Sequence, residues 1–217
     1  MYSGSVTPSS SDCVFCGQAA TTRDHIPPKG VFLDPLPTDL VTAPACAACN
    51  NSTKLDDEYF RALIATQGYW TVDGARLWKE KVVGSSFRKR PKFRQMLARN
   101  IIELPPEHRH PDLPGGVKAV TFDAQRINRV LRKIVLGLYW QHEKKQLPTD
   151  ISIEPFKDRL VDDHARAIFA SRPEYSIGGG AFKYRWGVAS DDAHVSIWHL
   201  MFYEKTVFVV SVGVPEL

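Results

Sequence analysis

Two pairs of cysteines have the spacing of a tetrahedral metal site. Each pair forms a C-x-x-C knuckle, and together they account for every cysteine of the chain: Cys13, Cys16, Cys46 and Cys49. Four thiolates close the coordination sphere of zinc and leave no position for water or substrate. The sequence therefore predicts a structural Zn²⁺ that staples two distant segments together. The alternative is a set of buried free thiols.

Polar residues suited to phosphodiester hydrolysis lie between and just after the knuckles. Such hydrolysis needs a water nucleophile, a base and a cation that neutralises developing charge on oxygen. Asp24 offers a hard oxygen ligand for Mg²⁺ or Mn²⁺, and Asn50 or Asn51 offers an amide oxygen. The imidazole of His25, whose ordinary pKa lies near neutrality, is suited to act as the general base. The alternatives are a turn aspartate beside a surface histidine, and a helix-capping role for Asn50.

One geometric condition applies to this pair. Adjacent residues on a strand point to opposite faces, so Asp24 and His25 share one site only where the strand is bulged or ends. Pro27 and Pro28 follow directly and cannot donate backbone hydrogen bonds. The sequence therefore favours a strand that ends at this point.

Taken together, these motifs resemble the HNH nucleases with a ββα-metal core, in the zinc-stabilised branch with C-x-x-C, D-H-x-x-P and C-x-x-C-N. The resemblance covers residues 13–60. It implies that His25 is the general base and that Asp24 and Asn50 hold the catalytic Mg²⁺ or Mn²⁺, with Asn51 as a competitor for Asn50. The implied activity is endonucleolytic cleavage of nucleic acid, with DNA expected over RNA. The family's middle asparagine has no clear counterpart, although Asp39 stands at about its place.

The elements expected to position these residues follow the order strand, loop, strand, helix. The strands are expected over 21–25 and 40–44 and the helix over 54–66, with residues 50–53 as its capping segment. This hairpin and helix would form the ββα unit.

The remainder of the chain predicts helices and then strands, giving an α+β fold. Helices are expected over 75–102, 123–144 and 156–169, a loop over 103–116, and an antiparallel meander of strands over 182–188, 195–203 and 206–212. Gly178 to Gly180 is interpreted as a flexible hinge. The expected organisation is a flexible tail (1–12), an HNH nuclease module (13–70) and an α+β substrate-binding or regulatory region (71–217).

The charge distribution points to a nucleic-acid partner. The formal net charge is only +4, but residues 76–99 carry nine basic side chains and one acid, a local balance of +8. Aromatic residues interleave with these charges, as in surfaces that follow a phosphate backbone. The residues expected to contact nucleic acid are Arg23, Lys29, Lys54, Arg88, Lys89, Arg90, Lys92 and Arg94. The alternative is a solvated helix face.

The sequence has no signal-peptide pattern and no apolar run long enough for a membrane span, which favours a cytoplasmic protein. The oligomeric state is left open. Two rivals to the nuclease hypothesis remain. One is a non-catalytic zinc ribbon that binds nucleic acid or protein. The other is a nuclease toxin or defence effector whose C-terminal region senses a trigger.

Overall fold

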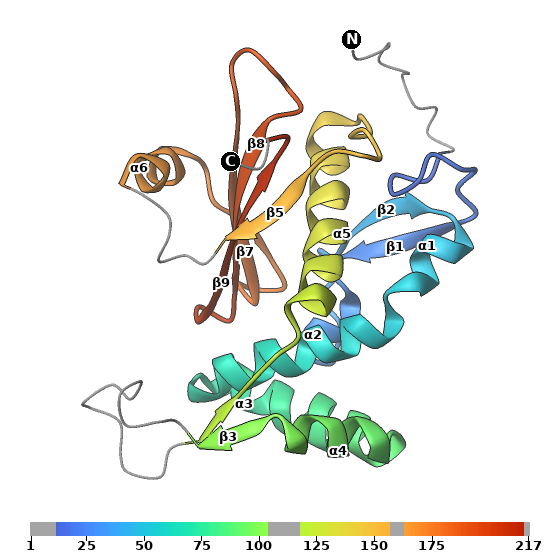
Figure 1. Ribbon diagram of the computed structural model, residues 1–217, viewed down its shortest axis with the longest axis vertical. Coiled ribbons are helices and arrows are strands. Elements are labelled where there is room, and N and C mark those ends of the chain that lie inside the picture. The colour runs from blue at the N-terminus through green and yellow to red at the C-terminus, as the bar shows by residue number, and fades with distance from the viewer. Residues whose placement is uncertain (1–11, 104–117, 157–162, 215–217) are drawn as a thin grey trace.

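A long central helix separates two β-structures in this α+β protein (Figure 1). The computed structural model describes residues 12–103, 118–156 and 163–214. A small N-terminal hairpin lies on one side of the helix and a larger antiparallel sheet on the other. The predicted fold class is thereby confirmed at the level of mixed helices and a C-terminal antiparallel sheet.

The N-terminal segment has the expected order of elements. Strands β1 (Thr22–Ile26) and β2 (Val41–Ala45) pair antiparallel, with a 3-10 turn, η1 (Lys29–Val31), between them. Helices α1 (Ala47–Ser52) and α2 (Lys54–Gln67) follow. The N-cap of α2 is Thr53, the last residue of the predicted capping segment, whereas residues 50–52 belong to a short helix that was not predicted, α1. The N-cap of α1 is Cys46, whose Sγ accepts a hydrogen bond from the Cys49 N–H at 3.4 Å.

The basic segment is helical, as expected, but not uniformly α-helical. The short turn η2 (Gly68–Trp70) leads into α3 (Val72–Leu77), the ten-residue π-helix η3 (Trp78–Phe87) and α4 (Pro91–Arg99). Strands β3 (Ile101–Glu103) and β4 (Lys118–Val120) then form a hairpin that the sequence did not predict. The proline-rich stretch between them lies outside the described residues.

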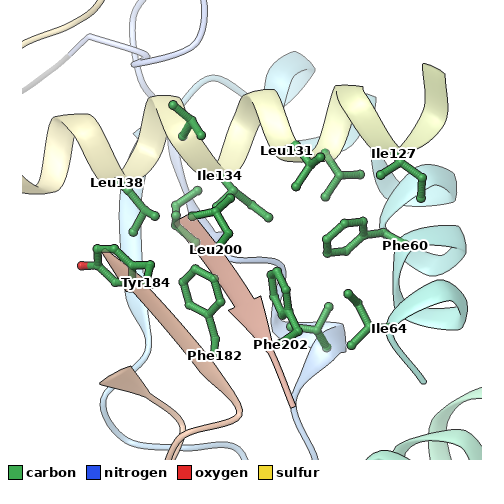
Figure 2. Close-up of a cluster of buried hydrophobic side chains, with 14 of the residues drawn as sticks. Phe60, Ile64, Ile127, Leu131, Ile134, Leu138, Phe182, Tyr184, Leu200 and Phe202 are labelled. Atoms are coloured by element: carbon green, nitrogen blue, oxygen red, sulfur yellow. The ribbon is translucent and has the colours of Figure 1, made fainter. Parts of the chain in front are cut away.

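Helix α5 (Ala124–Glu143) confirms the clearest sequence prediction. Its N-cap is Asp123, whose carboxylate accepts hydrogen bonds from the Gln125 and Arg126 N–H groups, and it ends at Lys144 in a left-handed conformation. Its apolar stripe packs between α2 and the large sheet, and the side chains in this core include Phe60, Ile64, Ile127, Leu131, Ile134, Leu138, Phe182, Leu200 and Phe202 (Figure 2).

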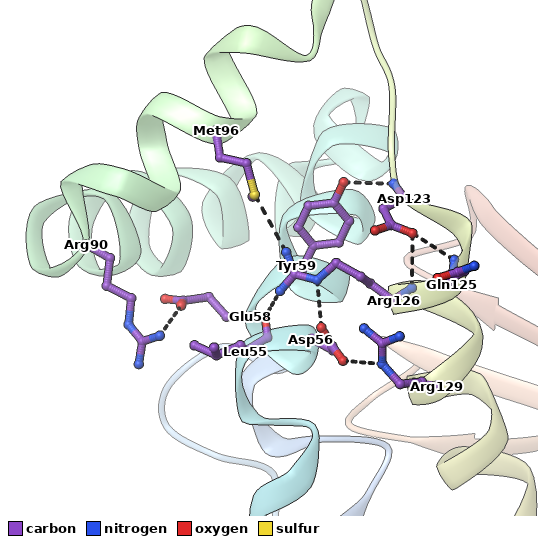
Figure 3. Close-up of polar contacts among 10 residues, drawn as sticks. All are labelled: Leu55, Asp56, Glu58, Tyr59, Arg90, Met96, Asp123, Gln125, Arg126 and Arg129. Carbon is purple, nitrogen blue, oxygen red and sulfur yellow. Dashed lines mark hydrogen bonds and ion pairs between the residues drawn. The ribbon is translucent and has the colours of Figure 1, made fainter.

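Asp56 of α2 fixes α5 by accepting hydrogen bonds from two arginines (Figure 3). Its two carboxylate oxygens each lie 2.7 Å from a guanidinium Nε, one of Arg126 and one of Arg129. Burial alone would raise the pKa of Asp56, but the two guanidinium groups overcome it and leave the pKa below its ordinary value. Helices α2 and α5 are thus held in a fixed relation by a paired, partly buried carboxylate.

The C-terminal sheet has the strand order β5-β9-β8-β7-β6. Strands β7 (Phe182–Val188), β8 (Ser196–Phe202) and β9 (Thr206–Val212) are the predicted meander. Strands β5 (Ile153–Phe156) and β6 (Tyr175–Ile177) were missed, and α6 (Asp163–Ser171) begins later than the predicted helix. The glycines 178–180 all have positive φ and form the tight turn between β6 and β7, which is a more defined role than the hinge expected from the sequence.

The hydrophobic core is continuous across residue 70, where a module boundary was expected. Two hydrogen bonds also tie the segment after β1 to the C-terminal sheet. The Tyr203 hydroxyl donates to the Val31 carbonyl at 2.8 Å, and the Gly178 N–H donates to the Asp39 carboxylate at 3.0 Å. The ββα segment therefore sits on a scaffold supplied by the rest of the chain.

Candidate metal centre and active site

The four thiols converge on one point beside the hairpin. Their sulfur atoms all lie within 4.8 Å of one another, and Cys16 Sγ is 3.7 Å from Cys46 Sγ. A tetrahedral zinc with Zn–S bonds of about 2.3 Å requires sulfur atoms about 3.8 Å apart. The cluster can therefore hold a structural zinc. Within the described ranges it is the one group of three or more Cys, His, Asp or Glu side chains that meets this condition.

Local structure explains why the first knuckle reaches the second. Gly17 has a φ of +76°, which allows its N–H to turn back and donate to the Cys13 carbonyl at 2.8 Å. The next backbone bond joins the knuckle to the hairpin, because the Val14 N–H donates to the Pro44 carbonyl of β2 at 3.1 Å. Cys46 follows β2 directly, so both knuckles share one strand as their support.

The thiols have unequal acidities. The Cys49 N–H lowers the pKa of the Cys46 thiol to about 7, whereas burial raises the pKa of Cys49. Thiolates this close together would repel one another, which a cation between them would offset. A bound divalent metal would favour the thiolate form of all four.

The inner face of β1 lies against α5. Two contacts join the helix to the strand: Lys133 contacts Asp24, and Gly137, one turn further along α5, contacts Ile26. Asp24 Oδ2 is 2.5 Å from Lys133 Nζ, and a Cβ on Gly137 would fall 2.5 Å from the Ile26 side chain. The absence of a side chain at Gly137 thus allows α5 to approach β1 closely enough for Asp24 to pair with Lys133.

His25 occupies the opposite, outer face of β1. The β1–β2 register is unbroken through Asp24↔Ala43 and His25↔Thr42, so the strand has no bulge there, and it continues to Ile26 rather than ending at His25. Arg23 shares the outer face, where its Nε donates to Thr42 Oγ1 at 2.7 Å. The side chains of Asp24 and His25 therefore extend from opposite faces of one strand.

Partial burial, and next the positive charge of Lys29, lower the pKa of His25. Both effects disfavour the protonated ring. His25 consequently keeps its neutral form, which can accept a proton, to lower pH than an exposed histidine would.

The two asparagines have different settings. The Asn50 Nδ2 donates to Thr22 Oγ1 at 3.0 Å and to the Arg23 carbonyl at 3.2 Å. The Asn51 Nδ2 instead donates to the Ala47 carbonyl of its own helix at 2.7 Å. Asn50 is therefore held beside the backbone that precedes Asp24, whereas Asn51 is directed to its own helix.

Two charged residues at this site were missed by sequence reasoning. They are Lys133 of α5 and Asp57 of α2. Burial is the main cause that raises the pKa of Asp57 to about 6, and Lys133 and Asp24 both act on it electrostatically. No sequence motif signals this set, because its members come from three elements far apart in the chain.

The residues expected to contact nucleic acid are solvent-accessible. Those with exposed side chains are Arg23, Lys29, Lys54, Arg88, Lys89, Arg90, Lys92 and Arg94. Of these, Arg90 pairs with Glu58 at 3.3 Å and Arg23 binds Thr42.

Arg61 joins the basic segment to the loop after His25. A Cβ on Gly30 would lie 2.7 Å from one guanidinium nitrogen of Arg61, so the backbone of this loop rests on that group. Another nitrogen of the same group, Nη2, donates to Ser86 Oγ of η3 at 2.5 Å. Lys81 of η3 also pairs with Asp34 at 2.5 Å. The helix η3 of the basic segment therefore lies beside the loop between β1 and β2.

Comparison with known proteins adds no assignment: the chain matches no protein-family model, no curated protein and no solved structure. Fold and site together define an α+β protein with a four-cysteine cluster that could bind zinc. None of the helices in the described ranges is both long and apolar enough to cross a bilayer.

Proposed function

We propose that this protein is a metal-dependent endonuclease of the HNH type that cleaves nucleic-acid phosphodiesters at the free edge of β1. The observation that carries the proposal is the setting of Asp24 and His25: they are neighbours on β1, the thiol cluster closes the hairpin beside them, and Asn50 is bound to the backbone of the same strand. The residues of the sequence motif thus gather around β1, which supports the proposal.

On this regular strand Asp24 and His25 can serve one reaction only across the edge of β1, with one group on each side of the substrate. In an in-line displacement the attacking water and the leaving oxygen lie on opposite sides of phosphorus. Strand β1 has one neighbour in its two-stranded sheet, so its other edge is unpaired. A phosphodiester along that edge could be approached by His25 from the outer face and by Asp24 from the inner face. His25 would accept the proton of the attacking water at its unprotonated ring nitrogen.

The inner side of β1 offers ligands of the type that Mg²⁺ and Mn²⁺ prefer. Asp24 Oδ2 and Asp57 Oδ1 are buried and have no hydrogen-bond partner among the described residues. The Asn50 Nδ2 donates hydrogen bonds to β1, so its amide oxygen is the atom that could bind a cation. Hard oxygen donors of this kind fit a hard divalent cation, which when bound would stabilise negative charge on the departing oxygen. Asp24 and Asn50 are the residues proposed to hold it.

The basic segment would bind the phosphate backbone on either side of the cleaved bond. Its exposed side chains start beside the loop that follows His25, and Arg61 lies at the junction. Charge contacts of this kind do not depend on sequence. DNA is the proposed substrate over RNA, and a defence or toxin role is compatible with cleavage of this kind.

A cleavage assay tests the proposal. The zinc-loaded full chain would be incubated with supercoiled plasmid, single-stranded DNA and RNA in Mg²⁺, in Mn²⁺ and in EDTA. Nicking that requires the divalent cation supports the proposal. Stoichiometric zinc and nucleic-acid binding without nicking under any condition would instead support the zinc-ribbon alternative. The ion pair between Asp24 and Lys133 favours that alternative, because Lys133 occupies the proposed metal ligand. A trigger-dependent effector would begin to nick only when its partner is added.

Neutralising the basic segment should flatten the salt dependence of nucleic-acid binding. The test variant replaces three exposed residues with serine: Arg88, Lys89 and Lys92. Every phosphate that is no longer neutralised by a basic side chain lowers the slope of log affinity against log salt by about 0.9 on duplex DNA, so a decrease of up to about 3 is expected. Fluorescence anisotropy over a salt series measures the slope. A charge-matched control replaces Lys145, Arg172 and Lys205. Equal slopes in both variants would make the segment a solvated helix face.

A further inference from the structure

Lys133 brings a positive charge from α5 into the unit formed by the hairpin and α1. Its Nζ lies 2.5 Å from Asp24 Oδ2 and donates to the Cys49 carbonyl at 3.0 Å and to Thr53 Oγ1 at 3.1 Å. Two of the three N–H donors of this ammonium serve the Cys49 carbonyl and Thr53 Oγ1, and Asp24 is its ion-pair partner. These partners come from β1, from the second cysteine knuckle and from the residue between α1 and α2.

The ammonium is enclosed as well as paired. The side chain of Lys133 is 13% exposed and that of Asp24 15% exposed. The Phe15 ring, in the first knuckle, lies 5.0 Å from Nζ. Charges in such a setting are weakly screened by solvent, so their interactions are stronger than those of surface pairs. Lys133 is therefore an integral part of the site.

A second carboxyl group lies in the electrostatic field of this pair. Burial raises the pKa of Asp57 to about 6, the charge of Lys133 opposes that shift and the charge of Asp24 adds to it. The contact with Asp24 is an ion pair without hydrogen-bond geometry, so Asp24 Oδ2 counts among the buried oxygens with no hydrogen-bond donor. The proposed ligand oxygen of Asp24 is thus already occupied by a cation, the ammonium of Lys133.

We propose that Lys133 is a resident counter-cation that competes with a divalent metal for Asp24. The inference rests on the proposed function in one respect, the role of Asp24 as a metal ligand. A dication on Asp24 would be repelled by an ammonium 2.5 Å from the same carboxylate, so it must displace Lys133 or bind against its charge. Metal affinity is then controlled from α5, outside the ββα unit.

Removing the charge of Lys133 should tighten Mn²⁺ binding. The Lys133→Met chain is expected to bind Mn²⁺ at least about tenfold more tightly than the wild type, because the repulsion is removed and Asp24 is left without a partner. Lys133→Arg keeps the charge and should show no gain. Lys145→Met removes an exposed lysine of the same charge elsewhere and should bind Mn²⁺ like the wild type.

Electron paramagnetic resonance of free Mn²⁺ measures the affinity on zinc-loaded full-length chains, and zinc content and thermal melting verify the fold. Lys133→Gln is a second test variant, because its amide can still donate to the Cys49 carbonyl and Thr53 while carrying no charge. Adding Asp24→Asn to Lys133→Met should cancel the gain. Affinities in Lys133→Met and Lys133→Gln no higher than in the wild type would overturn the proposal, as would a gain that survives Asp24→Asn.

Cleavage by the same proteins separates this inference from the nuclease proposal. Tighter, Asp24-dependent Mn²⁺ binding without nicking in any variant would support competition at Asp24 and overturn the nuclease function. Metal-dependent nicking by the wild type with no gain of affinity in the Lys133 variants would support the nuclease and overturn the competition.

Discussion

Replacing His25 with alanine should lower metal-dependent cleavage by about 100- to 10,000-fold, the range that a general base typically contributes. The neutral imidazole, favoured by partial burial and by Lys29, is the proton acceptor of the proposed reaction. Alanine cannot accept that proton, and water would have to replace the base. Single-turnover cleavage at saturating Mn²⁺, on the nucleic acid that the wild type cuts best, measures the effect.

The same substitution should leave the fold in place. His25 lies on the outer face of β1, and in the described part of the structure it makes no hydrogen bond or ion pair that alanine would leave unsatisfied. Zinc content and melting temperature should therefore stay close to those of the wild type. His194→Ala is the matched control, because that histidine is exposed and pairs with Asp192 in the C-terminal region. A cleavage rate unchanged by His25→Ala would remove the proposed mechanism.

The local parts of the site were predictable, because they depend on short-range patterns. The C-x-x-C spacing identified all four thiols that converge, and the apolar and turn residues identified β1, β2 and α2 within one or two residues of their bounds. Side-chain alternation likewise set the condition that Asp24 and His25 face apart on a regular strand. The strand ends before the prolines, as expected, but one residue later than predicted, because Ile26 still pairs with Val41.

The tertiary parts were not predictable from one sequence. Lys133 contacts Asp24 only because α5 packs against β1, and that depends on Gly137 meeting Ile26. Asp39 contacts the turn after β6 rather than the loop that carries His25. Strands β5 and β6, four and three residues long, carry too few residues for a period-2 pattern and gain their pairing from β9 and β7.

Zinc removal should unfold the N-terminal hairpin and thereby disrupt the proposed active site. Structural zinc contributes roughly 10–16 kcal/mol in small zinc-binding peptides, comparable to the whole folding free energy of a typical domain. Here the metal would join knuckles 30 residues apart in the chain. Cys13, fully buried, and its neighbour Val14 connect the cluster to the core. Without zinc, the buried thiols would lack the interaction that offsets ordering of the two knuckles.

The expected unfolding is local first, because most of the apolar core belongs to α2, α5 and the C-terminal sheet rather than to the hairpin (Figure 2). In Cys13→Ser, hydrogen exchange should become fast in β1 and β2, while β7 to β9 keep most of their protection. The melting temperature should fall by about 10 °C or more. Mass spectrometry of hydrogen exchange, with zinc content measured on the same sample, gives both readouts. A chelator should reproduce the effect in the wild type and add nothing to Cys13→Ser. Zinc-free wild-type protein that keeps a protected hairpin would show that the hairpin does not require the metal, and that its contacts with α5 and the C-terminal sheet hold it in place.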